Sequence, residues 1–167
     1  MNVLPEISRK ELAKNQEDAW DFLFLFIDKY GEIIASDTQE TEEPFNGSQH
    51  TLMAFNFLYG EVANGGFLQL IQNGYGRYVF DTPFADTIRA WGAEQTAQIV
   101  EEARTVYEEH REELEKEVSI EEFSEMYDEY TDFESLDDRF YEIMGDDLEI
   151  VKKYVENHLG EFAILID

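Results

Sequence analysis

Cysteine is absent from this 167-residue chain, which excludes disulfide bonds and thiolate chemistry and is typical of a reducing cytoplasm. Long apolar runs are absent too. The longest, Phe22–Ile27, has six residues, whereas a membrane-spanning helix needs about 20. The first residues contain no apolar stretch of the kind that a secretory signal requires. We therefore expect a cytoplasmic protein without a membrane segment.

Catalytic and metal-binding motifs are also missing. The sequence contains no HExxH, GxSxG, Walker A or helix-opening GxGxxG motif, and no calcium-binding loop with its central glycine. The three histidines, His50, His110 and His158, are scattered along the chain. Asp146 and Glu149 are spaced as helix-capping residues rather than as metal ligands. We expect no enzymatic activity, no cofactor and no specific metal site.

Basic residues are scarce. The chain has 12 lysines and arginines against 39 acidic residues, a net charge of −27. Phosphates repel such a chain, which argues against direct binding to nucleic acid or to anionic membranes, while basic surfaces attract it. The acid is concentrated in residues 101–149, which hold 21 acidic and four basic residues. Apolar and aromatic residues recur there at helical spacing, so we expect folded helices rather than a disordered tail.

The first third of the chain has a clear helix start. Ser8 and Glu11 match a capping box, in which each side chain satisfies a free backbone amide. Apolar spacing predicts a helix from Ser8 to a stop at Gly31. Residues 32–48 are expected to form mostly a loop, and helical spacing resumes at Leu52.

Several shorter helices are expected further along. Thr82 and Pro83 suit the cap and first position of one helix, and Ser119 with Glu122 forms a second capping box. The apolar segment 162–166 is expected to dock as a strand or an extended tail. We therefore predict an all-α fold of about seven to nine helices, a single domain over residues 1–167 with an acidic outer helical face. The expected helices cover about residues 82–92, 97–114, 119–130, 136–143 and 146–159.

Near the middle of the chain, Asn64-Gly65-Gly66 interrupts the helical spacing, because these residues tolerate positive φ. A hairpin turn is one alternative, but the flanks lack period-two alternation, so we expect a tight helix–helix connection. The second helix should end near Asn73-Gly74, with the amides of Gln69 and Asn73 bonded to nearby backbone. We expect this motif to be structural. Its residues are Glu61, Asn64, Gly65, Gly66, Phe67, Gln69 and Asn73.

Acidic residues repeat on the outward side of the later helices. If residues 101–149 fold as two antiparallel halves, they span about 37 Å and carry about one charge per 2 Å. Duplex DNA carries one charge per about 1.7 Å. A helical surface of this kind can resemble a phosphate backbone to a basic DNA-binding protein, and a solvated acidic face is the alternative. The candidate partner-binding residues are Glu101, Glu102, Glu108, Glu109, Glu112 and Glu113, and then Glu121, Glu122, Glu125 and Asp128.

The string from Gly60 to Gln69, followed by Asn73-Gly74 and by Ile88–Ala93, resembles the bacterial nineteen-kilodalton DNA-mimic protein family. The resemblance covers about residues 50–105. It implies a helical, non-enzymatic homodimer that imitates duplex DNA, binds a helix-turn-helix transcriptional repressor and blocks its access to DNA. The alternative is an acidic adaptor or immunity-type protein that binds a basic partner without imitating DNA.

Overall fold

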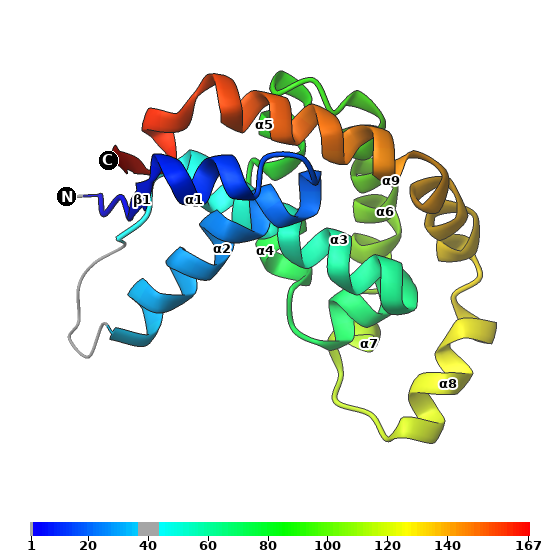
Figure 1. Ribbon diagram of the computed structural model, residues 1–167. Coiled ribbons are helices and arrows are strands. Elements are labelled where there is room, and N and C mark those ends of the chain that lie inside the picture. Colours follow the sequence, from blue (N-terminus) through cyan, green and yellow to red (C-terminus); the bar gives the residue numbers. More distant parts are fainter. Residues whose placement is uncertain (1, 37–43) are drawn as a thin grey trace. The chain divides into compact units, whose positions relative to one another are not determined.

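Helices dominate the computed structural model, which describes residues 2–36 and 44–167 (Figure 1). The described residues form nine α-helices and two short strands, which confirms the all-α fold. The helices are α1 (Arg9–Lys14), α2 (Ala19–Ser36), α3 (Gly47–Gln72), α4 (Gly76–Phe80), α5 (Phe84–Ala90), α6 (Glu94–Glu109), α7 (Arg111–Glu115), α8 (Ile120–Glu129) and α9 (Asp132–Asn157). The strands are β1 (Glu6–Ser8) and β2 (Ile164–Ile166), and the 3-10 turn η1 (Leu159–Glu161) precedes β2.

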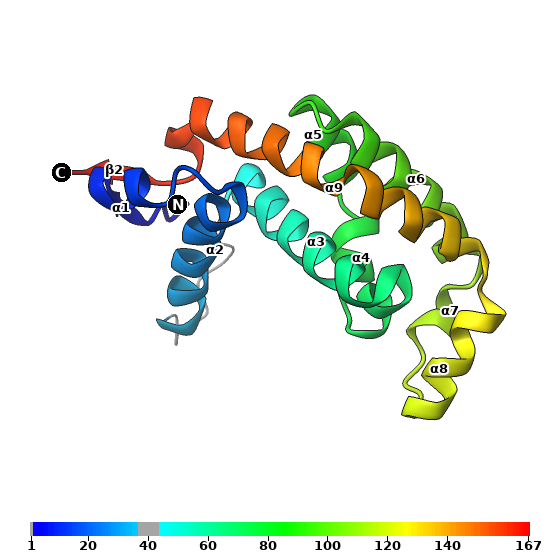
Figure 2. The ribbon, with the colours of Figure 1, turned by 45° about the vertical axis from the view of Figure 1, so that its right-hand side comes forward.

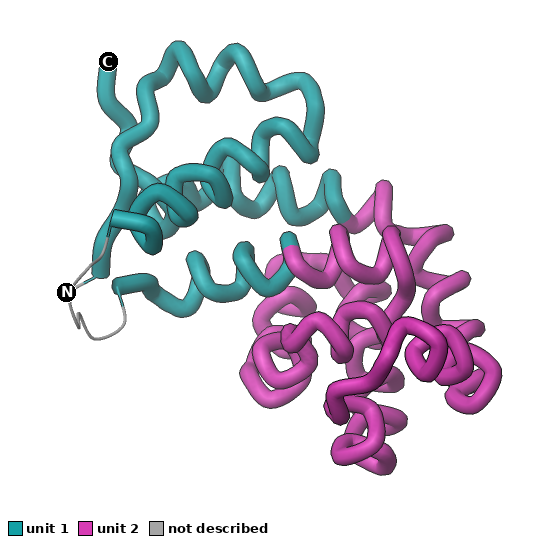
Figure 3. Tube along the Cα trace, turned by 90° about the horizontal axis from the view of Figure 1, so that it is seen from below, with its two compact units in different colours: residues 1–56, 148–167 teal, residues 57–147 magenta. Residues whose placement is uncertain are grey.

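The chain divides into two compact units, coloured separately in Figure 3. The first unit comprises residues 1–56 and 148–167, and the second comprises residues 57–147. The boundaries fall inside α3 and α9, so each of these helices contributes residues to both units. The expectation of a single domain over the whole chain stays a prediction.

In the first unit, the terminal segments pair as a small parallel sheet, with Glu6 opposite Ile164. Of the two alternatives expected for residues 162–166, a strand or an extended tail, the strand is present over Ile164–Ile166. Its partner β1 was not predicted, because three residues are too few to show an alternating pattern. The buried face of α2 includes Phe22, Phe26 and Tyr30, and the Tyr30 hydroxyl donates to the Phe162 carbonyl oxygen at 2.8 Å.

The N-terminal helix prediction was only partly right. The Ser8 capping box is present, but α1 ends at Lys14, where the Asn15 side-chain amide donates to the Glu11 carbonyl at 2.8 Å. Gly31 does not end α2, because a glycine inside a helix costs only about 1 kcal/mol, and at this exposed position none of the described residues lies within 4 Å of an added Cβ. Residues 32–36 of the expected loop therefore belong to α2, and residues 37–43 lie outside the described part of the chain.

Two helix starts in the second unit were also wrong. Thr82 does not cap α5, because its hydroxyl donates to the Tyr78 carbonyl at 2.7 Å, at the end of α4. Asp146 does not begin a new helix, and the two last predicted helices are one helix, α9. The neighbouring Asp147 is buried and accepts from the backbone amide and hydroxyl of Thr96 at 2.8 and 2.6 Å. Asp147 thus caps the first turn of α6, at a residue 51 positions earlier in the chain.

Candidate functional site: an acidic surface in the second unit

Most of the acidity lies in the second unit, where residues 57–147 contain 24 acidic and six basic residues. This unit also contains a break inside α3. Gly66 has φ 78° and ψ −175°, which confirms the predicted break at Asn64-Gly65-Gly66 and excludes the hairpin alternative. Phe67, Leu68 and Leu70 beyond the break are buried, as the expected short helix requires.

Side chains from α8 and α9 satisfy the backbone groups at this break. The Tyr127 hydroxyl donates to the Gly65 carbonyl at 2.7 Å, and the Tyr141 hydroxyl donates to the Val62 carbonyl at 3.0 Å. The Phe67 amide donates to Asp137 Oδ1 at 2.9 Å. The hydrogen bonds at the glycine break therefore link α3 to two of the acidic helices, α8 and α9. Sequence reasoning missed all three partners, because 62 to 79 residues separate them from α3.

The polar residues of the motif bond to one another. Glu61 Oε2 accepts from the amides of Gln69 and Asn73 at 2.7 and 2.8 Å. Asn64 Nδ2 donates to Gln69 Oε1 at 3.0 Å. The expectation that the Gln69 and Asn73 amides satisfy the backbone was therefore wrong, because a charged carboxylate lies within reach and forms the stronger hydrogen bond. The structural role of the motif stays a prediction.

Asp137 makes folding sensitive to pH. Burial, aided by the nearby charges of Asp138 and Glu134, raises the pKa of Asp137 from 3.8 to about 6, although the Phe67 amide opposes the shift. Between these two values the folded state holds a proton that the unfolded state has released. The contribution of Asp137 to stability therefore falls as pH rises from about 4 to 6.

We expect Asp137→Asn to remove this dependence. The free energy of unfolding of the variant, relative to that of the original protein, should rise by about 1–2 kcal/mol from pH 4 to pH 6, allowing for the partial exposure of the carboxylate. Urea unfolding of both proteins at each pH measures the difference, and the carboxylates common to both cancel. A difference that is independent of pH would contradict the assignment.

Two of the candidate contact residues are neutralised by arginines. Arg89 Nη1 lies 2.6 Å from Glu101 Oε1. Arg139 reaches from α9 to both Glu102 oxygens, at 2.9 and 2.7 Å, where α6 and α9 lie side by side (Figure 2). These hydrogen bonds hold the pKa of each glutamate below its usual range. Glu101 and Glu102 therefore offer less free charge than their positions in the sequence indicate.

Two more arginines of the second unit form ion pairs with acidic side chains. Arg77 lies 3.1 Å from Glu115 Oε1, and Tyr107 donates to the other Glu115 oxygen at 2.6 Å. Arg111 forms a bidentate ion pair with Asp81, in which Nη1 and Nη2 each donate to one carboxylate oxygen at 2.7 Å. Four of the six basic residues of the second unit are thus engaged in these four pairs.

Another group of carboxylates is exposed and has no such partner. Among the described residues, no lysine or arginine nitrogen lies within 4.0 Å of them, and Glu109 is 3.9 Å from His110 Nε2. Glu122 is excluded from this group because it closes the capping box with Ser119, which confirms that prediction. We call the group the acidic surface. Its residues are Glu108, Glu109, Glu112, Glu113, Glu121, Glu125 and Asp128.

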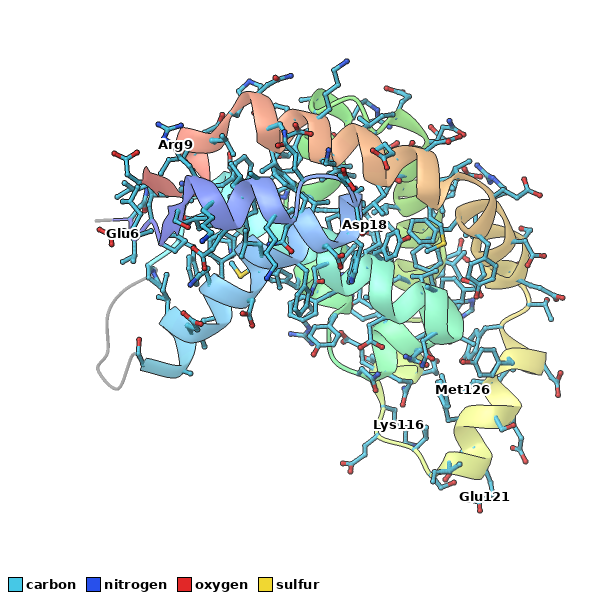
Figure 4. All side chains as sticks on the ribbon, in the orientation of Figure 1. Glu6, Arg9, Asp18, Lys116, Glu121 and Met126 are labelled. Carbon is cyan, nitrogen blue, oxygen red and sulfur yellow. The ribbon has the colours of Figure 1, made fainter. Side chains whose placement is uncertain are left out.

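The acidic surface comes from three helices. His110 separates α6 from α7, so the expected single helix over residues 97–114 is wrong. Residues 101–149 form parts of four helices rather than two antiparallel halves, and the estimate of one charge per 2 Å does not apply. A hollow of about 240 Å³ joins the two sets of candidates, since Glu113 of α7 and Glu125 of α8 both line it. Figure 4 labels Glu121 at the lower end of α8, and it also labels Lys116 and Met126, which line this hollow.

The described part of the chain contains neither a cluster of metal ligands nor a membrane-spanning helix. No group of three or more carboxylates and histidines there is arranged to hold a metal ion. Over residues 2–36 and 44–167, no helix combines the length and the apolar character needed to cross a membrane.

Comparison with known proteins connects these features to a family. The family model described as DMP19-like protein matches residues 43–158, which include the glycine break and the whole acidic surface. The chain is also similar to the DNA mimic protein DMP19 of Neisseria meningitidis serogroup B. The two are 30% identical over 149 residues, which cover 89% of this chain and 90% of that protein.

Proposed function

Because the chain belongs to the DMP19-like protein family, we propose that it is a DNA mimic that binds a basic DNA-binding protein. The partner that we propose is a helix-turn-helix transcriptional repressor, which the bound mimic keeps away from its operator. The observation that carries this proposal is the acidic surface. Its seven exposed carboxylates have no arginine or lysine partner among the described residues, while four arginines bind other acids of the same unit.

The chemistry of the acidic surface suits a protein that grips phosphates. Such a protein presents lysines, arginines and backbone amides to phosphate oxygens, and these groups also bind carboxylates. Helices hold the carboxylates in place, so ordering the acidic surface costs little on binding. We propose that binding releases ions from both surfaces, so that affinity falls as salt rises.

The family resemblance also motivates a proposal for the assembly. We propose that the protein acts as a cytoplasmic homodimer, because helix-turn-helix repressors bind paired half-sites as dimers and a paired mimic can occupy both recognition helices.

Competition with DNA is the decisive test of the mimic. Proteins captured at low salt from a bacterial lysate are identified, and a captured helix-turn-helix protein is then purified with its operator duplex. We expect unlabelled mimic to displace fluorescent operator from it, with an effect that weakens steeply between 50 and 200 mM salt. If operator and mimic bind the repressor at the same time, the protein is an adaptor and mimicry is wrong.

A further inference from the structure

A second hollow, with a volume of about 580 Å³, shares Val118 with the hollow between Glu113 and Glu125. One wall comes from the last third of α3 and the residue after it, with the side-chain amides of Asn64, Gln72 and Asn73. The opposite wall is the segment that joins α7 to α8, with Glu117, and the start of α8. Residues of the glycine-break motif therefore line one side of the hollow. The other side belongs to the acid-rich stretch 101–149.

The three amides that line this wall use their N–H groups in hydrogen bonds within the protein. Asn64 and Asn73 donate to Gln69 and Glu61, and Gln72 Nε2 donates to the carbonyls of Leu114 and Lys116. These bonds fix which way each amide points. Within the described chain, the side-chain oxygens of Asn64, Gln72 and Asn73 accept no hydrogen bond. A ligand that offers several donors and no acceptor would satisfy them.

The other wall supplies charge and apolar contact. Glu117 has no basic side chain within 4.0 Å in the described residues, and no lysine or arginine is among the described residues that line the hollow. Val118, Ile120 and Phe123 form an apolar side, and Ile120 is 86% exposed. A side chain with a long apolar stem and a cationic head that donates several hydrogen bonds would match both the charge and the apolar side.

We propose that this hollow takes an arginine side chain of the basic partner, an inference that rests on the proposed function. A guanidinium is planar, carries five N–H donors, has no acceptor and is always charged. Its head can bond the amide oxygens and Glu117 while it lies near the Phe123 ring, a contact that favours cations. Val118 lines both this hollow and the one between Glu113 and Glu125, so one basic segment can reach both.

A titration without the partner tests the hollow directly. A blocked Ala-Arg-Ala peptide is added to the isotope-labelled protein at low salt, and the side-chain amide resonances of Asn64, Gln72 and Asn73 are followed. Matched peptides carry lysine or the uncharged citrulline in place of arginine. We expect saturable shifts with arginine, and binding at least threefold weaker with lysine or citrulline. Equal binding of the arginine and lysine peptides, or shifts confined to the acidic surface, would overturn the assignment.

Two variants separate the hollow from net charge. Glu117→Gln removes the charge at the hollow, and Glu149→Gln removes an exposed charge in the first unit. We expect the first to weaken the arginine peptide at least threefold and the second to leave it unchanged, and equal effects would overturn the proposal. If a DNA-competitive partner binds Glu117→Gln as tightly as the original protein, the hollow is wrong but mimicry stands. If the arginine peptide binds here but no partner competes with DNA, mimicry is wrong and the hollow stands.

Discussion

Replacing four glutamates at the junction of α6 and α7 with glutamine is expected to weaken binding to the helix-turn-helix partner at least fivefold. Each exposed interfacial charge contributes about 0.2–1 kcal/mol, so four contribute about 1–4 kcal/mol. Glutamine keeps the shape and the helix propensity, so only the charge changes. Binding is measured by fluorescence anisotropy at fixed low salt. The residues are Glu108, Glu109, Glu112 and Glu113.

A control with the same loss of charge makes this result specific. Four exposed acids of the first unit are changed to their amides, which lowers the net charge equally but leaves the acidic surface intact. We expect less than a threefold loss of affinity from this control. If both variants lose affinity to the same extent, net charge drives binding and the acidic surface is not the mimic. The control residues are Glu17, Asp21, Asp28 and Glu149.

The charge variant should remain folded. The four glutamates that it replaces are exposed and close in the chain, and in the described residues no lysine or arginine nitrogen lies within 4.0 Å of them, so their charges repel one another without a compensating ion pair. Removing the charges should therefore leave the free energy of unfolding unchanged or slightly higher, which thermal denaturation will show. A large loss of stability would mean that these residues hold the fold rather than the partner.

Gly66→Ala is expected to destabilise the protein by about 2–4 kcal/mol. An alanine at φ 78° costs about 1 kcal/mol in backbone strain. Its Cβ would also overlap the Asp137 carboxylate, which must move and lose its bond to the Phe67 amide, a loss of about 1.5–3 kcal/mol. The melting temperature should fall by about 4–15 °C. Since Gly66 lies outside the acidic surface, the folded variant should still bind the partner at low temperature.

Gly60→Ala is the matched control on the same helix. Gly60 is exposed, its φ is not positive and none of the described residues crowds an added Cβ, so alanine should stabilise the helix by about 0.4–1 kcal/mol. If Gly66→Ala is as stable as Gly60→Ala, the break does not anchor α8 and α9. If Gly66→Ala stays stable but loses the partner, the motif is a binding site and its structural interpretation is wrong.

Local signals in the sequence were reliable where the interacting groups are neighbours in the chain. The two capping boxes, at Ser8 and Ser119, join residues three apart, and both are present. The break at Gly66 was also foreseen, because positive φ is a property of the residue itself. Signals of the same kind failed at Gly31 and Asp146. In these two cases an exposed glycine stayed helical, and Asp146 lies inside α9, whereas its neighbour Asp147 caps α6.

The sequence by itself determined that the chain is helical, strongly acidic and broken at Asn64-Gly65-Gly66, because composition, apolar periodicity and glycine chemistry act over a few residues. Only the tertiary structure decided which carboxylates are without a basic partner. Arg89 and Glu101 are 12 residues apart, Arg139 and Glu102 are 37 apart, and no pattern in the chain predicts either pair. The reason is physical: an ion pair depends on where folding places two side chains, and that placement comes from the packing of whole helices around a shared core.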